Sequence, residues 1–230
     1  MPKTRNSATS SDQLSSQTPV STFRNLYTRV LLGLQAEQQQ VLGVTSAISG
    51  EGKTTVASGL ATALAEDGAL AGFGRDQDTI VLVECNMGSA PEDPRLSVRP
   101  GPGLVQVLRG EYELGEAIQP TGIERLVILP AGEPIQSFPM AIRAASLPDV
   151  IDELKAKYGL VVMDLPAILN SSDTQVLARL ANQLVVVVRA GVTPSKLVRQ
   201  ALDEIREAAI LGVVLNDSSS ELPAWLENRL

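Results

Sequence analysis

A glycine-rich turn between a strand-like run and a helix-like run constrains this chain more than any other feature. The turn reads Ala47-Ile-Ser-Gly-Glu-Gly-Lys-Thr54; the apolar run 41–45 precedes it and the alanine-rich run 53–65 follows it. It matches the P-loop pattern G-x-x-x-x-G-K-[ST], except that Ala47 stands at the first glycine and is small enough for a tight turn. Such a turn points backbone N–H groups inward at the positive end of a helix. The sequence therefore predicts a phosphate-binding loop.

The residue types in this loop predict ATP and Mg²⁺ as its ligands. Lys53 supplies a mobile positive charge for the β and γ phosphates, and the Thr54 hydroxyl is placed to ligate Mg²⁺. We expect the nucleotide contacts to come from Ser49, Gly50, Glu51, Gly52, Lys53, Thr54 and Thr55.

Three polar residues end apolar runs that we expect to be strands. Asp164 follows Val161-Val-Met, as a Walker B aspartate does, and is the expected partner of the magnesium. Glu84 ends run 79–84 and is the candidate metal ligand and base, or the group that positions a water. Asn216 ends run 211–216, where its amide could read adenine. The alternatives are an Asp164 that caps a turn, a surface Glu84 and a turn-forming Asn216.

Strand-like and helix-like runs alternate along most of the chain. This order predicts an α/β fold with a doubly wound, mostly parallel sheet. We expect a disordered leader over 1–20, one P-loop domain over 21–230, and a short tail over 217–230. The expected strands are 41–45, 79–84, 126–129, 160–164, 184–189 and 211–216, and the expected helices are 22–38, 53–65, 104–109, 148–158 and 194–208.

Composition excludes several function classes. A net charge of −7 and an aromatic content of 3% argue against nucleic acid as a partner. The chain has no histidine, which removes His-dependent hydrolysis and His-ligated zinc, and its one cysteine, Cys85, reads as a small buried apolar residue. No apolar run is long enough to span a bilayer. We expect a soluble, cytoplasmic chain that meets the membrane through a partner.

These motifs resemble the bacterial tyrosine kinases (BY-kinases) of capsule and exopolysaccharide assembly, which share their P-loop class with the MinD/ParA ATPases. The resemblance implies MgATP, transfer of the γ-phosphate to tyrosines of a C-terminal cluster on a neighbouring subunit, a homo-oligomeric ring, and a membrane-embedded polysaccharide co-polymerase as partner. It rests on Thr45-Ser46, Gly50–Thr55, Ile80–Asn86, Leu129-Pro-Ala-Gly132, Asp164-Leu-Pro-Ala167, Ser172-Asp173 and Val188-Arg-Ala-Gly191.

The sequence departs from the family's pattern at three places. The second acidic strand reads Glu84-Cys-Asn-Met-Gly88 where the family has Asp-x-Asp-x-Arg, so we expect slow chemistry. The tail 217–230 has no tyrosine, and the oligomerising helix reads Ser21-x-x-Arg24-x-x-Tyr27 in place of Glu-x-x-Arg-x-x-Arg. Ile48 stands where MinD/ParA ATPases carry a second lysine.

Three functions stay open at this point. The chain is a tyrosine kinase-like enzyme acting on other proteins, a catalytically dead regulator whose nucleotide state controls a polysaccharide co-polymerase, or another ATPase of the same fold. Enzymatic turnover separates the first from the second, and a partner unrelated to polysaccharide would indicate the third.

Overall fold

The computed structural model describes the central part of the chain and a few positions before it. Continuous stretches cover residues 40–68, 78–86, 93–132 and 146–217. Leu26, Thr28, Val30 and Leu32 are also described, and all four are helical. The leader expected over 1–20 and residues 218–230 of the expected tail lie outside the described residues.

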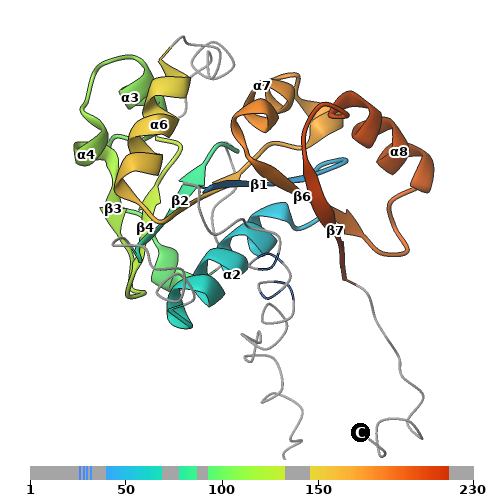
Figure 1. Cartoon of the computed structure of the whole chain (residues 1–230), viewed down its shortest axis with the longest axis horizontal. Coiled ribbons are helices and arrows are strands. Elements are labelled where there is room, and N and C mark those ends of the chain that lie inside the picture. Colours follow the sequence, from blue (N-terminus) through green and yellow to red (C-terminus); the bar gives the residue numbers. More distant parts are fainter. Residues whose placement is uncertain are drawn as a thin grey trace, which may run out of the picture.

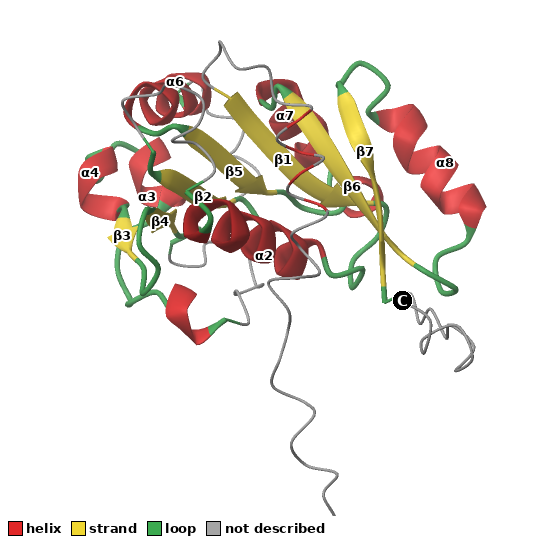
Figure 2. Ribbon diagram, turned by 60° about the horizontal axis from the view of Figure 1, so that its bottom comes forward, coloured by secondary structure: helices red, strands yellow, loops and turns green. Residues whose placement is uncertain are grey.

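The core of the molecule is a seven-stranded sheet in the order β3-β4-β2-β5-β1-β6-β7 (Figure 2). All neighbouring strands run parallel except β3 and β4, which pair antiparallel. The strands are β1 (Gln40–Ser46), β2 (Ile80–Glu84), β3 (Gln119–Pro120), β4 (Leu126–Leu129), β5 (Leu160–Asp164), β6 (Gln183–Arg189) and β7 (Ile210–Asn216).

Helices cover both faces of this sheet. Figure 1 shows α2 on one side and α6, α7 and α8 on the other. The helices are α2 (Lys53–Glu66), α3 (Leu104–Leu108), α4 (Leu114–Ala117), α6 (Leu147–Lys157), α7 (Asp173–Leu180) and α8 (Ser195–Glu204), with short 3₁₀ turns at Pro94–Leu96 and Ile168–Asn170.

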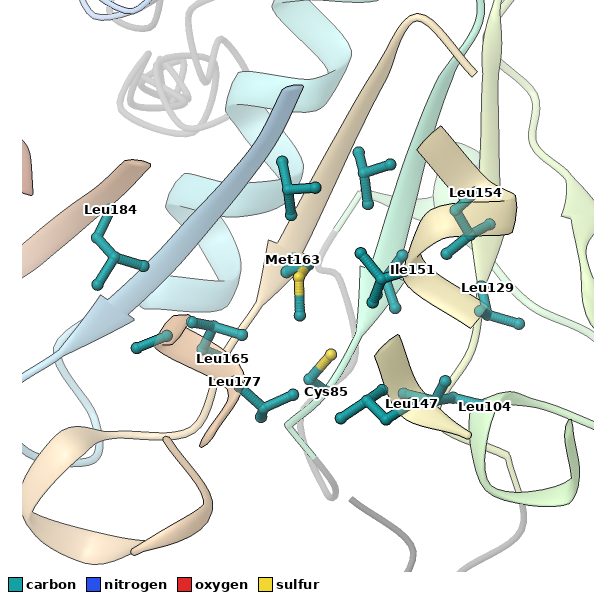
Figure 3. Packing of buried hydrophobic residues seen from close by; sticks show 14 of the residues in the cluster. Cys85, Leu104, Leu129, Leu147, Ile151, Leu154, Met163, Leu165, Leu177 and Leu184 are labelled. Carbon is teal, nitrogen blue, oxygen red and sulfur yellow. The ribbon is translucent and has the colours of Figure 1, made fainter. Parts of the chain in front are cut away.

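Two apolar clusters hold the helices against the sheet, and strand alternation assigns residues to each. In β5, Val161 and Met163 face the cluster under α3, α6, α7 and α8, whereas Leu160 and Val162 face the cluster under α2. All five residues of β5 are buried, as expected for a strand covered on both faces. Figure 3 shows the first cluster, with Cys85 packed near Leu147 and Leu177.

The fold class expected from the sequence is confirmed, together with most of its elements. Strands 126–129 and 160–164 have the expected bounds, and the other predicted strands differ by one or two residues at their ends. The helix expected over 22–38 is helical at its four described positions. Two helices, α4 and α7, and the antiparallel strand β3 were not predicted.

Gly103 directly precedes α3 and packs against the loop that follows β4. Leu104 N–H donates to the Pro130 carbonyl (2.8 Å), and Val105 N–H donates to the Ala131 carbonyl (3.2 Å). A Cβ on Gly103 would lie 2.3 Å from the Pro130 oxygen and 2.3 Å from the Gly132 nitrogen. Backbone cannot yield here as a flexible side chain could, so this contact requires glycine.

We predict that Gly103→Ala lowers the free energy of unfolding by roughly 1–3 kcal/mol, the usual cost of forcing extra volume into a packed site. Urea unfolding measures the change. Gly115→Ala is the control, because a Cβ there meets nothing within 4 Å, and it should change stability by less than about 1 kcal/mol. Equal stability of the parent and Gly103→Ala would contradict the assigned packing.

Candidate functional site

The loop between β1 and α2 curls as its glycines allow. Gly50 and Gly52 have φ values of 83° and 86°, in the left-handed region that favours glycine. A Cβ on Gly52 would lie 2.1 Å from Asn216 Nδ2, so this position also lacks room for a side chain. Helix α2 begins directly afterwards, at Lys53. The glycines thus place the loop backbone at the N-terminus of a fourteen-residue helix.

Glu51 holds the loop from inside the protein. Its buried carboxylate accepts hydrogen bonds from Ile48 N–H (2.7 Å), Arg189 N–H (3.2 Å) and the Thr193 hydroxyl (2.5 Å). Its side chain therefore points into the fold and ties the loop to the turn between β6 and α8. Of the groups on Glu51, only the backbone N–H is left for the expected phosphate contact.

Two asparagines support the same loop, one from the end of β7 and one from the 3₁₀ turn Ile168–Asn170. Asn216, at the end of β7, donates from its amide to the Glu51 carbonyl (3.0 Å). Asn170 accepts from Ser49 N–H (3.1 Å), and its neighbour Leu169 donates from its N–H to the Ala47 carbonyl (3.0 Å). In this structure the Asn216 amide is thus a brace for the loop, and adenine recognition by Asn216 stays a proposal.

Asp164 and Glu84 lie side by side because β2 and β5 pair in register. The Cα partners in that register include Glu84 with Asp164, and β1 pairs with β5 on its other side. The Thr54 hydroxyl donates to Asp164 Oδ2 (2.7 Å), and Ala131 N–H donates to Glu84 Oε2 (3.2 Å). The sequence predicted that Thr54, Asp164 and Glu84 meet at one crevice, and the structure places them together.

Each of the two carboxylates keeps one oxygen without a partner. Asp164 Oδ1 and Glu84 Oε1 are both buried and form no hydrogen bond within the described structure. A buried acceptor without a partner is costly, so a ligand for it is expected. Carboxylate oxygens are the ligands that Mg²⁺ prefers, and this donor set fits that ion.

The described residues contain no group of three or more His, Cys, Asp or Glu side chains that could hold a metal alone. Magnesium sites often combine one or two carboxylates with water and phosphate oxygens, and Asp164 and Glu84 offer two such carboxylates. The site therefore fits a metal that arrives with a phosphate ligand.

Burial raises the pKa of both carboxyl groups. The pKa of Asp164 rises to about 6, mainly through burial and also through the charge of Glu84, while the Thr54 hydrogen bond and the Lys53 charge act to lower it. Burial likewise raises the pKa of Glu84, partly offset by the hydrogen bond from Ala131. A nearby cation would relieve this shared negative charge.

The neighbouring thiol takes no part in this chemistry. Cys85 is fully buried, and burial together with the charges of Asp164 and Glu84 raises its pKa, so it stays unionised. The interpretation of Cys85 as a small buried apolar residue is confirmed by its packing.

Three features of the site were not predicted from the sequence. They are the contacts of Asn170 and Thr193 with the loop and the hydrogen bond from the Ala131 N–H. Ala131 and Arg189 belong to two phrases that carried the resemblance, Leu129-Pro-Ala-Gly132 and Val188-Arg-Ala-Gly191, but no role was assigned to either. The structure shows what both phrases contact: the first meets Glu84 and the second meets Glu51.

Comparison with known proteins identifies relatives over most of the chain. The succinoglycan biosynthesis transport protein ExoP of Rhizobium meliloti is 30% identical over 206 residues, which cover 85% of this chain and 24% of ExoP. The tyrosine-protein kinase CpsD of Streptococcus agalactiae serotype Ia is 24% identical, over 86% of this chain and 82% of CpsD. No family model matches the sequence.

Solved structures share the fold. The kinase domain of the Escherichia coli tyrosine kinase ETK superposes with a TM-score of 0.73 at 22% identity, covering 87% of this chain and 78% of that one. The chain is a homologue of the bacterial tyrosine kinases. The MinD protein of Pyrococcus horikoshii, solved with Mg-ADP, is a more distant match, with a TM-score of 0.57 at 26% identity over 83% of this chain and 76% of MinD.

This chain matches very different shares of the length of its homologues. It matches about a quarter of ExoP but most of CpsD. Within the described residues, none of the helices combines the length and the apolar character needed to cross a bilayer.

The raised pKa of Asp164 predicts a pH-dependent stability in the absence of Mg²⁺. Between pH 3.8 and about 6 the unfolded chain ionises this group before the folded chain does, so rising pH favours unfolding across that window. The loss should approach about 3 kcal/mol, since one pKa unit corresponds to about 1.4 kcal/mol. Asp164→Asn should lack this fall in the free energy of unfolding with rising pH, and it should be more stable than the parent at pH 7.

Urea unfolding in Mg²⁺-free buffer from pH 4 to pH 7 measures the effect. Asp203→Asn, on the exposed face of α8, is the charge-matched control and should follow the parent. If the free energy of unfolding depended on pH in the same way for the parent and Asp164→Asn, folding would not raise the pKa of Asp164.

Proposed function

We propose that this chain binds ATP with Mg²⁺ at the loop Ala47–Thr54 and acts as a tyrosine kinase-like protein of capsule or exopolysaccharide biosynthesis. The observation that carries the proposal is the cluster of Thr54, Asp164 and Glu84 at the loop, with two buried carboxylate oxygens that lack partners. The polysaccharide role comes from the homology to ExoP and CpsD, and the MinD structure with Mg-ADP supports the choice of ligand.

The phosphates would lie against the loop backbone. N–H groups between Gly50 and Thr55 would bind their oxygens, with the N-terminus of α2 behind them, whereas Ser49, whose N–H donates to Asn170, would contribute its hydroxyl. Lys53 is largely buried and lies close enough to Asp164 for its charge to lower the pKa of that acid. Its ammonium group would therefore be available to stabilise the β and γ phosphates of a bound nucleotide.

Thr54 and Asp164 would hold the magnesium, with Glu84 as the third candidate. When bound, the ion supplies positive charge that offsets the charge on the transferred phosphoryl group. The Thr54 hydroxyl now donates to Asp164, and it would turn its oxygen toward the metal. Glu84 would accept the proton of the attacking hydroxyl or position a water, and burial raises its pKa, which makes its carboxylate a stronger base.

Substitutions at the second acidic strand would weaken phosphoryl transfer. Glu84 is one methylene longer than the aspartate in the family's pattern, and Asn86 cannot take up a proton. Placement of the reacting groups to within about 1 Å matters for this chemistry. Residues 217–230 carry no tyrosine, and the acceptor we propose is a tyrosine of another protein.

The partner we propose is a membrane-embedded polysaccharide co-polymerase. ExoP and the Salmonella kinase wzc are about four times as long as the region they share with this chain. In our proposal such a co-polymerase would hold this chain at the cytoplasmic face of the membrane. Self-association into a homo-oligomer belongs to the same proposal.

A second candidate function is a catalytically dead regulator. Asn86 favours it, because an amide in place of a carboxylate keeps a metal-water contact but loses a base. ATP would then act by shifting the chain between two forms with different affinity for the partner. A partition-type ATPase is disfavoured by Ile48, which replaces the lysine that reaches across such dimers.

We predict that Lys53→Ala abolishes measurable MgATP binding, because it removes the one cation of the loop. Binding of a fluorescent ATP analogue in the presence of Mg²⁺ measures this. Lys155→Ala is the control: this partly buried lysine pairs with Asp152 on α6, has no contact with the loop, and its loss should leave affinity unchanged. Equal affinity of Lys53→Ala and the parent would refute the site assignment.

We also predict that Glu84→Asp combined with Asn86→Asp raises phosphotransfer or hydrolysis by about tenfold or more, which is about 1.4 kcal/mol of barrier. The double change restores two short carboxylates at this strand end. Release of γ-phosphate from labelled ATP, and transfer to a tyrosine-containing peptide, measure it. The same double change in a Lys53→Ala background is the control. No gain in the parent background would favour the regulator.

A further inference from the structure

Strand β7 forms one edge of the sheet and has an outer side that no described strand pairs with. In the described structure it pairs only with β6. The Asn216 carbonyl accepts from Ala190 N–H, so Asn216 faces β6. Because backbone groups alternate along a strand, those of Val213 and Leu215 face away from β6. Exposed edges of this kind are normally covered or blunted.

Two apolar side chains stand exposed along the same edge. Val213 is 49% exposed and Leu215 is 63% exposed. Their register partners in β6 are Val186 and Val188, which face the cluster under α7 and α8. Val213 and Leu215, here called the β7 patch, therefore lie on the α8 side of the sheet, at its open margin.

The chain leaves β7 through a fixed turn. Asp217 has a φ of 55°, in the left-handed region that asparagine and aspartate tolerate. Its carboxylate pairs with Arg189 at 2.8 Å, which ties the end of β7 to the end of β6. The last thirteen residues, 218–230, begin from this anchored point.

These residues carry an apolar pattern of their own. Leu222, Trp225, Leu226 and Leu230 are spaced three, one and four residues apart, as on one face of a helix. Pro223 stands near the start of this stretch, where a helix tolerates it, and Ser218–Ser220 before it suit a turn. Such a one-sided segment needs an apolar surface to cover.

The reach of the segment matches the position of the patch. From Asp217 to Leu222 the chain can span up to about 17 Å at 3.3–3.6 Å per residue. Val213 lies four residues before Asp217, about 13 Å back along β7. Leu215 is nearer still. Both residues of the patch are therefore within reach of Leu222 and Trp225.

We propose that residues 218–230 pack Leu222, Trp225 and Leu226 onto the β7 patch and cover this edge of the sheet within the same chain. Tethering gives the segment a millimolar effective concentration at the patch. A second copy of the chain is not tethered and lacks that advantage. The two side chains of the β7 patch also offer far less area than the 1,200–2,000 Å² that a typical stable interface buries.

Trp225 is the only tryptophan in the chain, so its fluorescence reports on the segment directly. In the full chain we expect blue-shifted emission and weak quenching by iodide. Leu215→Asp should shift the emission to the red and raise the quenching constant several-fold. Val98→Asp changes an exposed valine between the 3₁₀ turn Pro94–Leu96 and α3, away from β7, and should leave both readings unchanged.

A second variant keeps the test valid if Leu215→Asp perturbs folding. Leu222→Ser alters only the segment, and it should give the same red shift while the circular dichroism of the chain is preserved. Water-like Trp225 emission in the parent, unmoved by either change, would overturn the proposal. So would a blue shift that grows with protein concentration together with a dimer in sedimentation, since that result assigns the patch to a second copy.

Discussion

The position of β5 between β1 and β2 is the constraint on which the candidate site depends. Because all three strands run parallel and in register, the loop after β1, Asp164 at the end of β5 and Glu84 at the end of β2 meet at one edge of the sheet. The hydrogen bond from Thr54 to Asp164 then joins the first turn of α2 to that edge. All five residues of β2 and of β5 are buried, so helices cover both faces of these strands up to the two acids at their ends.

The loop is held by polar contacts that leave its outer surface free. Glu51 is buried, yet its carboxylate accepts three hydrogen bonds, which is how a charge inside a protein is made tolerable. Asp164 and Glu84 are different, because each keeps one buried oxygen without a partner. The fold thus gives hydrogen-bond partners to the carboxylate of Glu51, which supports the loop, but leaves one oxygen of Asp164 and one of Glu84 without a partner. This contrast supports our proposal that Asp164 and Glu84 take part in binding a cation.

Local signals sufficed to predict much of this arrangement. The glycines of the loop, the apolar runs of β2 and β5, and the acids at their ends all act over short stretches, so a single sequence reveals them. Helix α7 was missed because it is only eight residues long and begins in a Ser- and Asp-rich stretch typical of turns. Strand β3 has two residues and exists only through its pairing with β4. The roles of Glu51 and Asn216 were also beyond reach, since all their partners except Ile48 lie 138 to 165 residues away in the sequence.

The most direct test of the account is calorimetric titration of ATP into the chain with and without Mg²⁺, for the parent and for Asp164→Asn. If Asp164 holds the metal that accompanies the phosphates, Mg²⁺ should strengthen ATP binding by the parent, and this gain should vanish in Asp164→Asn while Mg²⁺-free binding persists. An equal gain from Mg²⁺ in both proteins, or no ATP binding by either, would contradict the central claim.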